Sequence, residues 1–140
     1  MTHYTSYDLI EWAKPFEKRK NALPKPKGSE VLIRVTAAGL CHSDLHVQKG
    51  YMDLGNEGRL TFAERGAELP MTFGHEIAGI VENTGADANS FKKGQQVLVF
   101  PWIGCGECAA CKEERESDCA SMRIIGLKQK GGFATHCLVE

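Results

Sequence analysis

The stretch C-G-E-C-A-A-C-K-E-E-R-E-S-D-C, residues 105–119, carries four cysteines in the pattern C-x2-C-x2-C-x7-C. Two-residue gaps let neighbouring thiolates converge on one ion, and a fourth thiolate completes a tetrahedron. Four thiolates leave no open coordination position, so we predict that Cys105, Cys108, Cys111 and Cys119 bind one structural zinc ion. A C-x-x-C redox pair would not need four cysteines. An iron–sulfur cluster uses similar ligands, and spacing alone does not separate it from zinc.

The length, composition and net charge of the chain exclude some classes of protein. The chain has 140 residues, the usual size of one domain, with 42% hydrophobic and 25% charged residues and a net charge of -1. This balance argues against nucleic-acid binding. No apolar run approaches the ~20 residues of a membrane span, and the N-terminus lacks an apolar export signal. We therefore expect no nucleic-acid or membrane partner and a cytoplasmic location, where clustered thiols favour metal binding over disulfides.

The pattern on either side of the cysteines indicates short strands separated by turns. The clearest strand is E-V-L-I-R-V-T-A-A, residues 30–38, in which β-branched residues alternate with others. Further strands are expected at 73–82, 95–100 and 132–140, two more around Trp12, and a helical turn at 60–65. These elements predict a mainly β domain, with a barrel as one arrangement. The sequence contains no G-x-G-x-x-G phosphate-binding pattern.

A second group of titratable residues lies nearer the N-terminus. C-H-S-D-L-H, residues 41–46, precedes G-H-E, residues 74–76. A cysteine and a histidine from these two segments could hold a second zinc whose incomplete protein ligation would admit water or substrate. From the residues alone, a lone buried cysteine is more often a small core residue than a ligand, and a lone histidine is more often a hydrogen-bonding group.

Taken together, the motifs resemble the N-terminal catalytic domain of zinc-dependent medium-chain alcohol dehydrogenases. G-H-E-I-A-G at 74–79 followed by Gly85 is similar to the zinc signature of that family, and C-H-S-D-L-H at 41–46 to its first ligand loop. P-W-I-G-C-G-E-C at 101–108 and the cysteines that follow resemble its structural-zinc loop. The resemblance covers nearly the whole chain. It implies a GroES-like, partly open β barrel over residues 1–140, with short helices and a projecting zinc lobe at about 101–122.

The resemblance also implies a role for each residue of the second group. Cys41 and His75 would ligate a catalytic zinc, and Glu76 would be a further ligand or a neighbouring carboxylate. Asp44 would accept a hydrogen bond from the far nitrogen of His75 and fix its tautomer. Asp44 has an alternative role as a helix cap.

Three further residues of this group have implied roles in proton transfer and coenzyme binding. Ser43 would accept the proton of the substrate hydroxyl, and His46 would pass it towards solvent, whereas His42 falls where the family places a residue near the coenzyme pyrophosphate. Ser43 could instead cap the helix, and His46 could be an exposed helix residue. The implied reaction moves a hydride between a zinc-bound alkoxide and NAD(P)+, so the substrate would be a small alcohol, aldehyde or ketone.

The chain departs from the family pattern in length. The family carries a Rossmann-type coenzyme domain and a further zinc ligand beyond this point, so we expect the isolated chain to be inactive and the full-length enzyme to be a homodimer or homotetramer. The segment 51–69 is longer than in the commonest members, and we expect it to shape substrate access. The family signature commonly ends in valine, where this chain has Ala88.

Two other classes of function stay open. One is a zinc-stabilised GroES-like binding module without catalysis, and the other is a co-chaperone, which would have no use for the residues of the second group. Three residues lack a motif context. We expect His3 and His136 at the surface and Cys137 as an ordinary buried thiol in the last strand.

Overall fold

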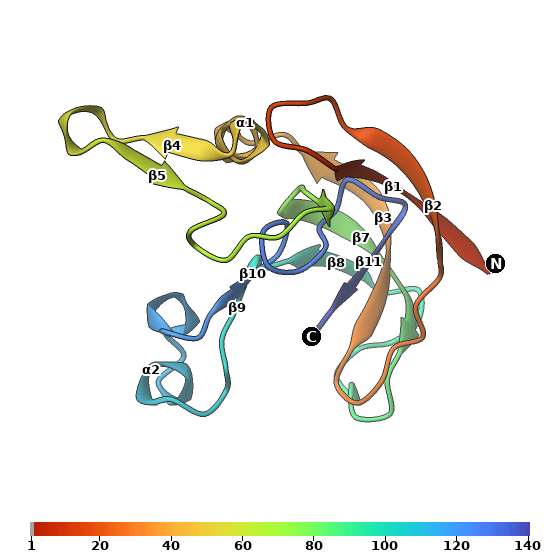
Figure 1. Cartoon of the computed structure of the whole chain (residues 1–140). Helices are drawn as coiled ribbons and strands as arrows, with labels where there is room; N and C mark the ends of the chain where they lie inside the picture. The colour runs from red at the N-terminus through yellow and green to blue at the C-terminus, as the bar shows by residue number, and fades with distance from the viewer. Residues whose placement is uncertain (1) are drawn as a thin grey trace.

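The structure is a computed structural model that describes residues 2–140. Its longest strand pairing joins β3 (Val31–Gly39) to β7 (Glu76–Thr84) in antiparallel register (Figure 1). β11 (His136–Val139) and β8 (Gln96–Val99) flank this pair and complete a four-stranded sheet. β3 forms because its first half is rich in β-branched residues, and Val31, Leu32 and Ile33 are all buried. The start of β3 is therefore covered on both faces, which differs from the expected alternation.

Three smaller sheets surround this one. β1 (His3–Leu9) pairs with both β2 (Glu17–Ala22) and β6 (Met71–Thr72). β4 (Tyr51–Asp53) pairs with β5 (Arg59–Thr61), and β9 (Trp102–Ile103) pairs with β10 (Arg123–Ile124). The expected mainly β fold is confirmed, but within residues 2–140 these sheets do not close into one barrel.

The helical elements are short and belong to two regions. α1 (His42–Lys49) begins where β3 ends and stops at Gly50, whose φ of 89° is the left-handed conformation that glycine adopts at helix ends. The 3-10 turn η1 (Gly55–Glu57) lies between β4 and β5. α2 (Ala109–Lys112) and the 3-10 turn η2 (Glu116–Asp118) form the region of the clustered cysteines.

Two apolar clusters hold the sheets together. The first lies on the four-stranded sheet and includes Val31, Ile33, Ile77, Val81, Ala88, Ile125, Cys137 and Val139. The second joins β1 to α1 and includes Leu9, Val47, Phe62 and Phe73. Phe73 is 1% exposed and lies directly before the G-H-E segment, so the second cluster fixes that segment against the helix.

One expectation from the sequence was partly right and another was wrong. Residues 60–65 were expected to form a helical turn; Leu60 and Thr61 instead belong to β5, but a turn follows directly, in which the N–H of Arg65 donates to the carbonyl of Phe62. The hairpin β4–β5 projects away from the central sheet beside α1 (Figure 1). His136 was expected at the surface but is 4% exposed, because Glu82 on β7 supplies a carboxylate oxygen 3.0 Å from its Nε2 and makes burial of the ring acceptable.

Other expectations held. His3 is exposed, and Cys137 is buried, where removal from water raises its pKa to about 12. Among residues 2–140, no helix combines the length and the apolar character that crossing a membrane requires.

Candidate metal centres

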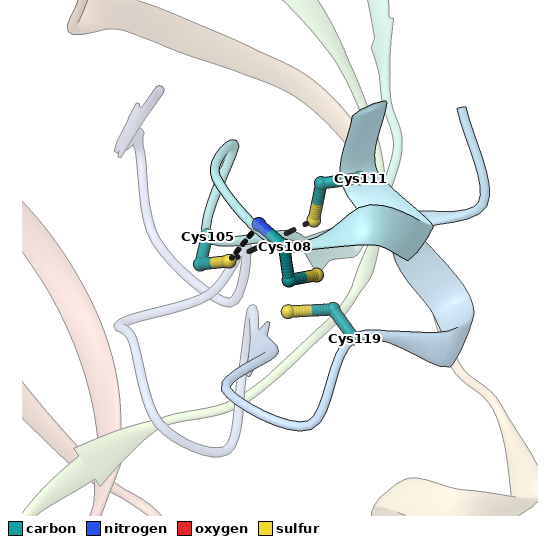
Figure 2. A group of neighbouring side chains, drawn as sticks. All are labelled: Cys105, Cys108, Cys111 and Cys119. Atoms are coloured by element: carbon teal, nitrogen blue, oxygen red, sulfur yellow. Dashed lines mark hydrogen bonds between the residues drawn. The ribbon is translucent and has the colours of Figure 1, made fainter. Parts of the chain in front are cut away.

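The four clustered cysteines converge on one point in a lobe that projects from the body of the chain (Figures 1 and 2). Their sulfur atoms all lie within 4.8 Å of one another, and the Sγ atoms of Cys105 and Cys111 are 3.9 Å apart. Zinc–sulfur bonds of about 2.3 Å in a tetrahedron place sulfur atoms about 3.8 Å apart. The cluster therefore fits a zinc ion with four thiolate ligands.

The backbone of the lobe prepares one of these thiols for ligation. The N–H groups of Glu107 and Cys108 point at the sulfur of Cys105 and lower its pKa to about 6. The N–H of Cys108 donates to this sulfur at 3.4 Å. Cys111 behaves oppositely, because removal from water raises its pKa to about 12. A bound cation would offset the repulsion of four thiolates and let them ionise together.

Gly104 provides the space that the cluster needs. A Cβ atom at this position would lie 2.5 Å from Sγ of Cys111 and 2.8 Å from Cγ of Glu116. The backbone of Gly104 does not have a positive φ, so the glycine is needed for space and not for conformation.

The second candidate centre is formed where β3 runs into α1 and where β7 begins. Cys41, His75 and Glu76 each offer one ligand atom, and these atoms lie within 4.8 Å of one another. Cys41 is the residue that caps the N-terminus of α1, and Glu76 is the first residue of β7. The antiparallel pairing of β3 and β7 brings together residues that are 34 positions apart in sequence. Three protein donors leave one position of a four-coordinate zinc ion free, so this group fits a zinc site that admits a further ligand.

Asp44 connects the helix to this group: it caps α1 as the sequence suggested, and it approaches His75 without reaching hydrogen-bond distance. Its Oδ2 accepts a hydrogen bond of 2.9 Å from the N–H of Cys41, which closes the first turn of α1. Its Oδ1 lies 3.6 Å from Nδ1 of His75. Because Asp44 is only 4% exposed, the carboxylate is held between these two groups. Because Nδ1 of His75 faces Asp44, Nε2 is the ring nitrogen that remains available to a metal ion.

Three further candidate residues lie on α1, and Ser43 is the one in contact with this group. The hydroxyl of Ser43 lies 3.3 Å from Nε2 of His75, so it is on the ligand side of the ring. The rings of His42 and His46 stack with their centres 4.7 Å apart. His42 is exposed and His46 is half-buried. The structure therefore gathers Cys41, Ser43, Asp44, His75 and Glu76 where α1 begins, whereas His42 and His46 pair with each other along the helix.

Sequence reasoning left Gly39 without a role, although it is the last residue of β3 and lies opposite Glu76. Its only signal in the sequence is its place two residues before Cys41.

Comparison with known proteins agrees with the motifs and the fold. Residues 27–140 match the family model described as the alcohol dehydrogenase GroES-like domain, so the chain belongs to this family. An NAD-dependent alcohol dehydrogenase of Sulfurisphaera tokodaii is 42% identical over 132 residues, which is 94% of this chain and 37% of that protein. The chain thus spans little more than a third of the length of this relative.

Solved structures of dehydrogenases have the same fold as this chain. The D-arabinose dehydrogenase of Sulfolobus solfataricus superposes with a TM-score of 0.80 at 33% identity, over 99% of this chain and 38% of that one. A cobalt- and zinc-bound thermostable alcohol dehydrogenase of Pyrobaculum aerophilum superposes with a TM-score of 0.82 at 26% identity, over 98% and 39%.

Proposed function

We propose that this chain is the metal-binding, substrate-activating domain of an NAD(P)-dependent zinc alcohol dehydrogenase or carbonyl reductase. The observation that carries the proposal is the convergence of Cys41, His75 and Glu76 beside Ser43 and Asp44. Thiolate, imidazole and carboxylate ligands with an open side are the donor set of a catalytic zinc site. The name of the Sulfurisphaera relative, an NAD-dependent alcohol dehydrogenase, supports the same class of reaction.

The two metal centres would have different tasks. Cys105, Cys108, Cys111 and Cys119 would hold a structural zinc, because four thiolates leave no position for substrate. Cys41, His75 and Glu76 would hold the catalytic zinc, which when bound supplies a Lewis acid that polarises an alcohol or carbonyl oxygen. Because the relatives are much longer than this chain, we propose that residues outside 1–140 bind the nicotinamide and complete the ligand set.

The side chains of α1 would manage the proton that the reaction releases. Ser43 lies on the ligand side of His75, so its hydroxyl can accept a proton from an alcohol that enters the open side of the centre. His46 follows Ser43 by three residues, and its half-buried ring can exchange a proton with solvent. Asp44 would keep His75 in the tautomer that leaves Nε2 free to ligate. His42 is exposed at the start of the helix, where it can meet a coenzyme phosphate.

The proposal is tested by alcohol-dependent NAD(P)+ reduction with the protein at its full natural length. The conservative changes Ser43→Ala and Cys41→Ser should each lower kcat/KM, and only Cys41→Ser should also remove a metal ion. Equal activity in the unchanged protein, in Ser43→Ala and in Cys41→Ser would contradict the proposal. A protein that keeps only the metal held by the cysteine lobe would instead be the non-catalytic binding module.

A further inference from the structure

The last residue of β3 and the first residue of β7 face each other directly. Gly39 pairs with Glu76 in the antiparallel register, so a side chain at either position projects to the same face of the sheet. The carboxylate of Glu76 lies in the space over the Gly39 backbone. A Cβ atom at residue 39 would overlap Oε2 of Glu76 and would come within 3.0 Å of its Cβ and 3.2 Å of its Cδ.

The backbone does not require glycine at this position. Residues with a positive φ favour glycine, but Gly39 is not among them and lies in a regular strand. Gly39 is the last residue of β3, and a glycine in a strand often marks the close approach of another group. Here that group is the carboxylate of Glu76, which is one of the three candidate ligands of the second centre.

We infer that Gly39 is a positioning residue that reserves a place for the Glu76 carboxylate beside Cys41 and His75. This inference rests on the proposed metal centre. In the space over Gly39, the carboxylate stays within 4.8 Å of the other two ligand atoms. A methyl group at residue 39 would displace the carboxylate, because its oxygen is the flexible end of the side chain and yields more readily than the paired backbone. The strand and Cys41 would stay in place, and only the donor set would change.

The inference predicts a specific coupling between two residues. Gly39→Ala should alter the metal centre only through Glu76, so the same change in a Glu76→Ala background should have no further effect. If Gly39 acted merely through the strand, its substitution would have the same effect in both backgrounds.

The test uses Co2+ as a spectroscopic probe in the protein at its full natural length, after removal of zinc. The absorption of Co2+ bound at the second centre is obtained as the difference between the protein and its Cys41→Ser variant. Gly39→Ala should weaken Co2+ binding by about 10-fold, a typical effect of disturbing a ligand's surroundings. Its difference spectrum should match that of Glu76→Ala, and the double variant should equal Glu76→Ala.

Gly104→Ala is a matched control. Gly104 also lacks a positive φ and also lies against a candidate ligand, but that ligand is Cys111 in the other centre. Gly104→Ala should leave the Cys41-dependent spectrum unchanged while it disturbs the cysteine lobe. Circular dichroism of each variant establishes that the β fold is retained.

The possible outcomes separate the inference from the proposed function. If the protein shows no Cys41-dependent Co2+ signal at all, the proposed catalytic centre is wrong and the inference fails with it. If the signal is present but Gly39→Ala matches the unchanged protein, only the role of Gly39 is wrong. The role of Gly39 is also wrong if Gly39→Ala weakens binding equally when Glu76 is already alanine.

Discussion

Asp44 is the residue at which helix stability and metal binding are most closely joined, and two substitutions should separate them. Asp44→Ala removes the acceptor of the Cys41 N–H bond from a site that is 4% exposed. Hydrogen bonds to charged groups contribute about 1.5–3 kcal/mol, and loss of a helix cap costs about 0.5–2 kcal/mol. The hydrogen bond from Cys41 to Asp44 is also the helix cap, so the two values are not added. We predict that Asp44→Ala lowers the free energy of unfolding by about 2 kcal/mol.

Asp44→Asn should behave differently. The amide oxygen can still accept from Cys41, so unfolding in urea with zinc removed should change by less than about 1 kcal/mol. The amide nitrogen would then face Nδ1 of His75, which lies 3.6 Å from the present carboxylate. A donor at this position favours the tautomer with its proton on Nε2, which opposes ligation. We predict a fall of about 10–100-fold in metal affinity at the second centre.

The two assays are urea unfolding of the zinc-free protein and competition for Co2+ with a chelator of known affinity. Unchanged metal affinity in Asp44→Asn would refute the argument that Asp44 orients His75. An unchanged unfolding midpoint in Asp44→Ala would refute the argument that it stabilises α1.

Three further predictions concern other parts of the chain. Removal of metal should speed amide hydrogen exchange in residues 101–122 while β3 and β7 keep their protection, and equal loss in both would show that the lobe is not held by metal. Replacing the β4–β5 hairpin by a short turn should change the relative kcat/KM values for small and bulky alcohols, because the hairpin lies beside α1; unchanged ratios would exclude a role in access. Phe73→Ala, at a side chain 1% exposed, should lower the free energy of unfolding by about 3–5 kcal/mol, whereas Phe91→Ala, at one 42% exposed, should change it far less.

The cysteine lobe could be predicted from sequence because its ligands are local. Cys105 and Cys119 are only 14 positions apart, and the two-residue gaps already limit where the sulfurs can go. The second centre is different, since Cys41 and His75 meet only through the pairing of β3 with β7. Residue patterns alone left that centre open, and the resemblance to a known family was needed to connect the two segments.

The errors have physical causes as well. The turn expected at 60–65 begins later because Leu60 and Thr61 belong to β5, and a three-residue strand carries too little alternation to be recognised from sequence. His136 was misplaced because its burial depends on Glu82, which is 54 positions away in sequence. Gly39 had no visible role because the reason for it is the position of another side chain.

The central claim is that the protein has two separate metal centres with different ligand sets. It is tested most directly by the zinc content of the purified full-length protein and of its Cys41→Ser and Cys105→Ser variants, measured by inductively coupled plasma mass spectrometry. The account predicts two zinc ions per chain and the loss of a different one in each variant, with the hydrogen-exchange protection of residues 101–122 lost only in Cys105→Ser. A single zinc that is lost with Cys105 and indifferent to Cys41 would contradict it.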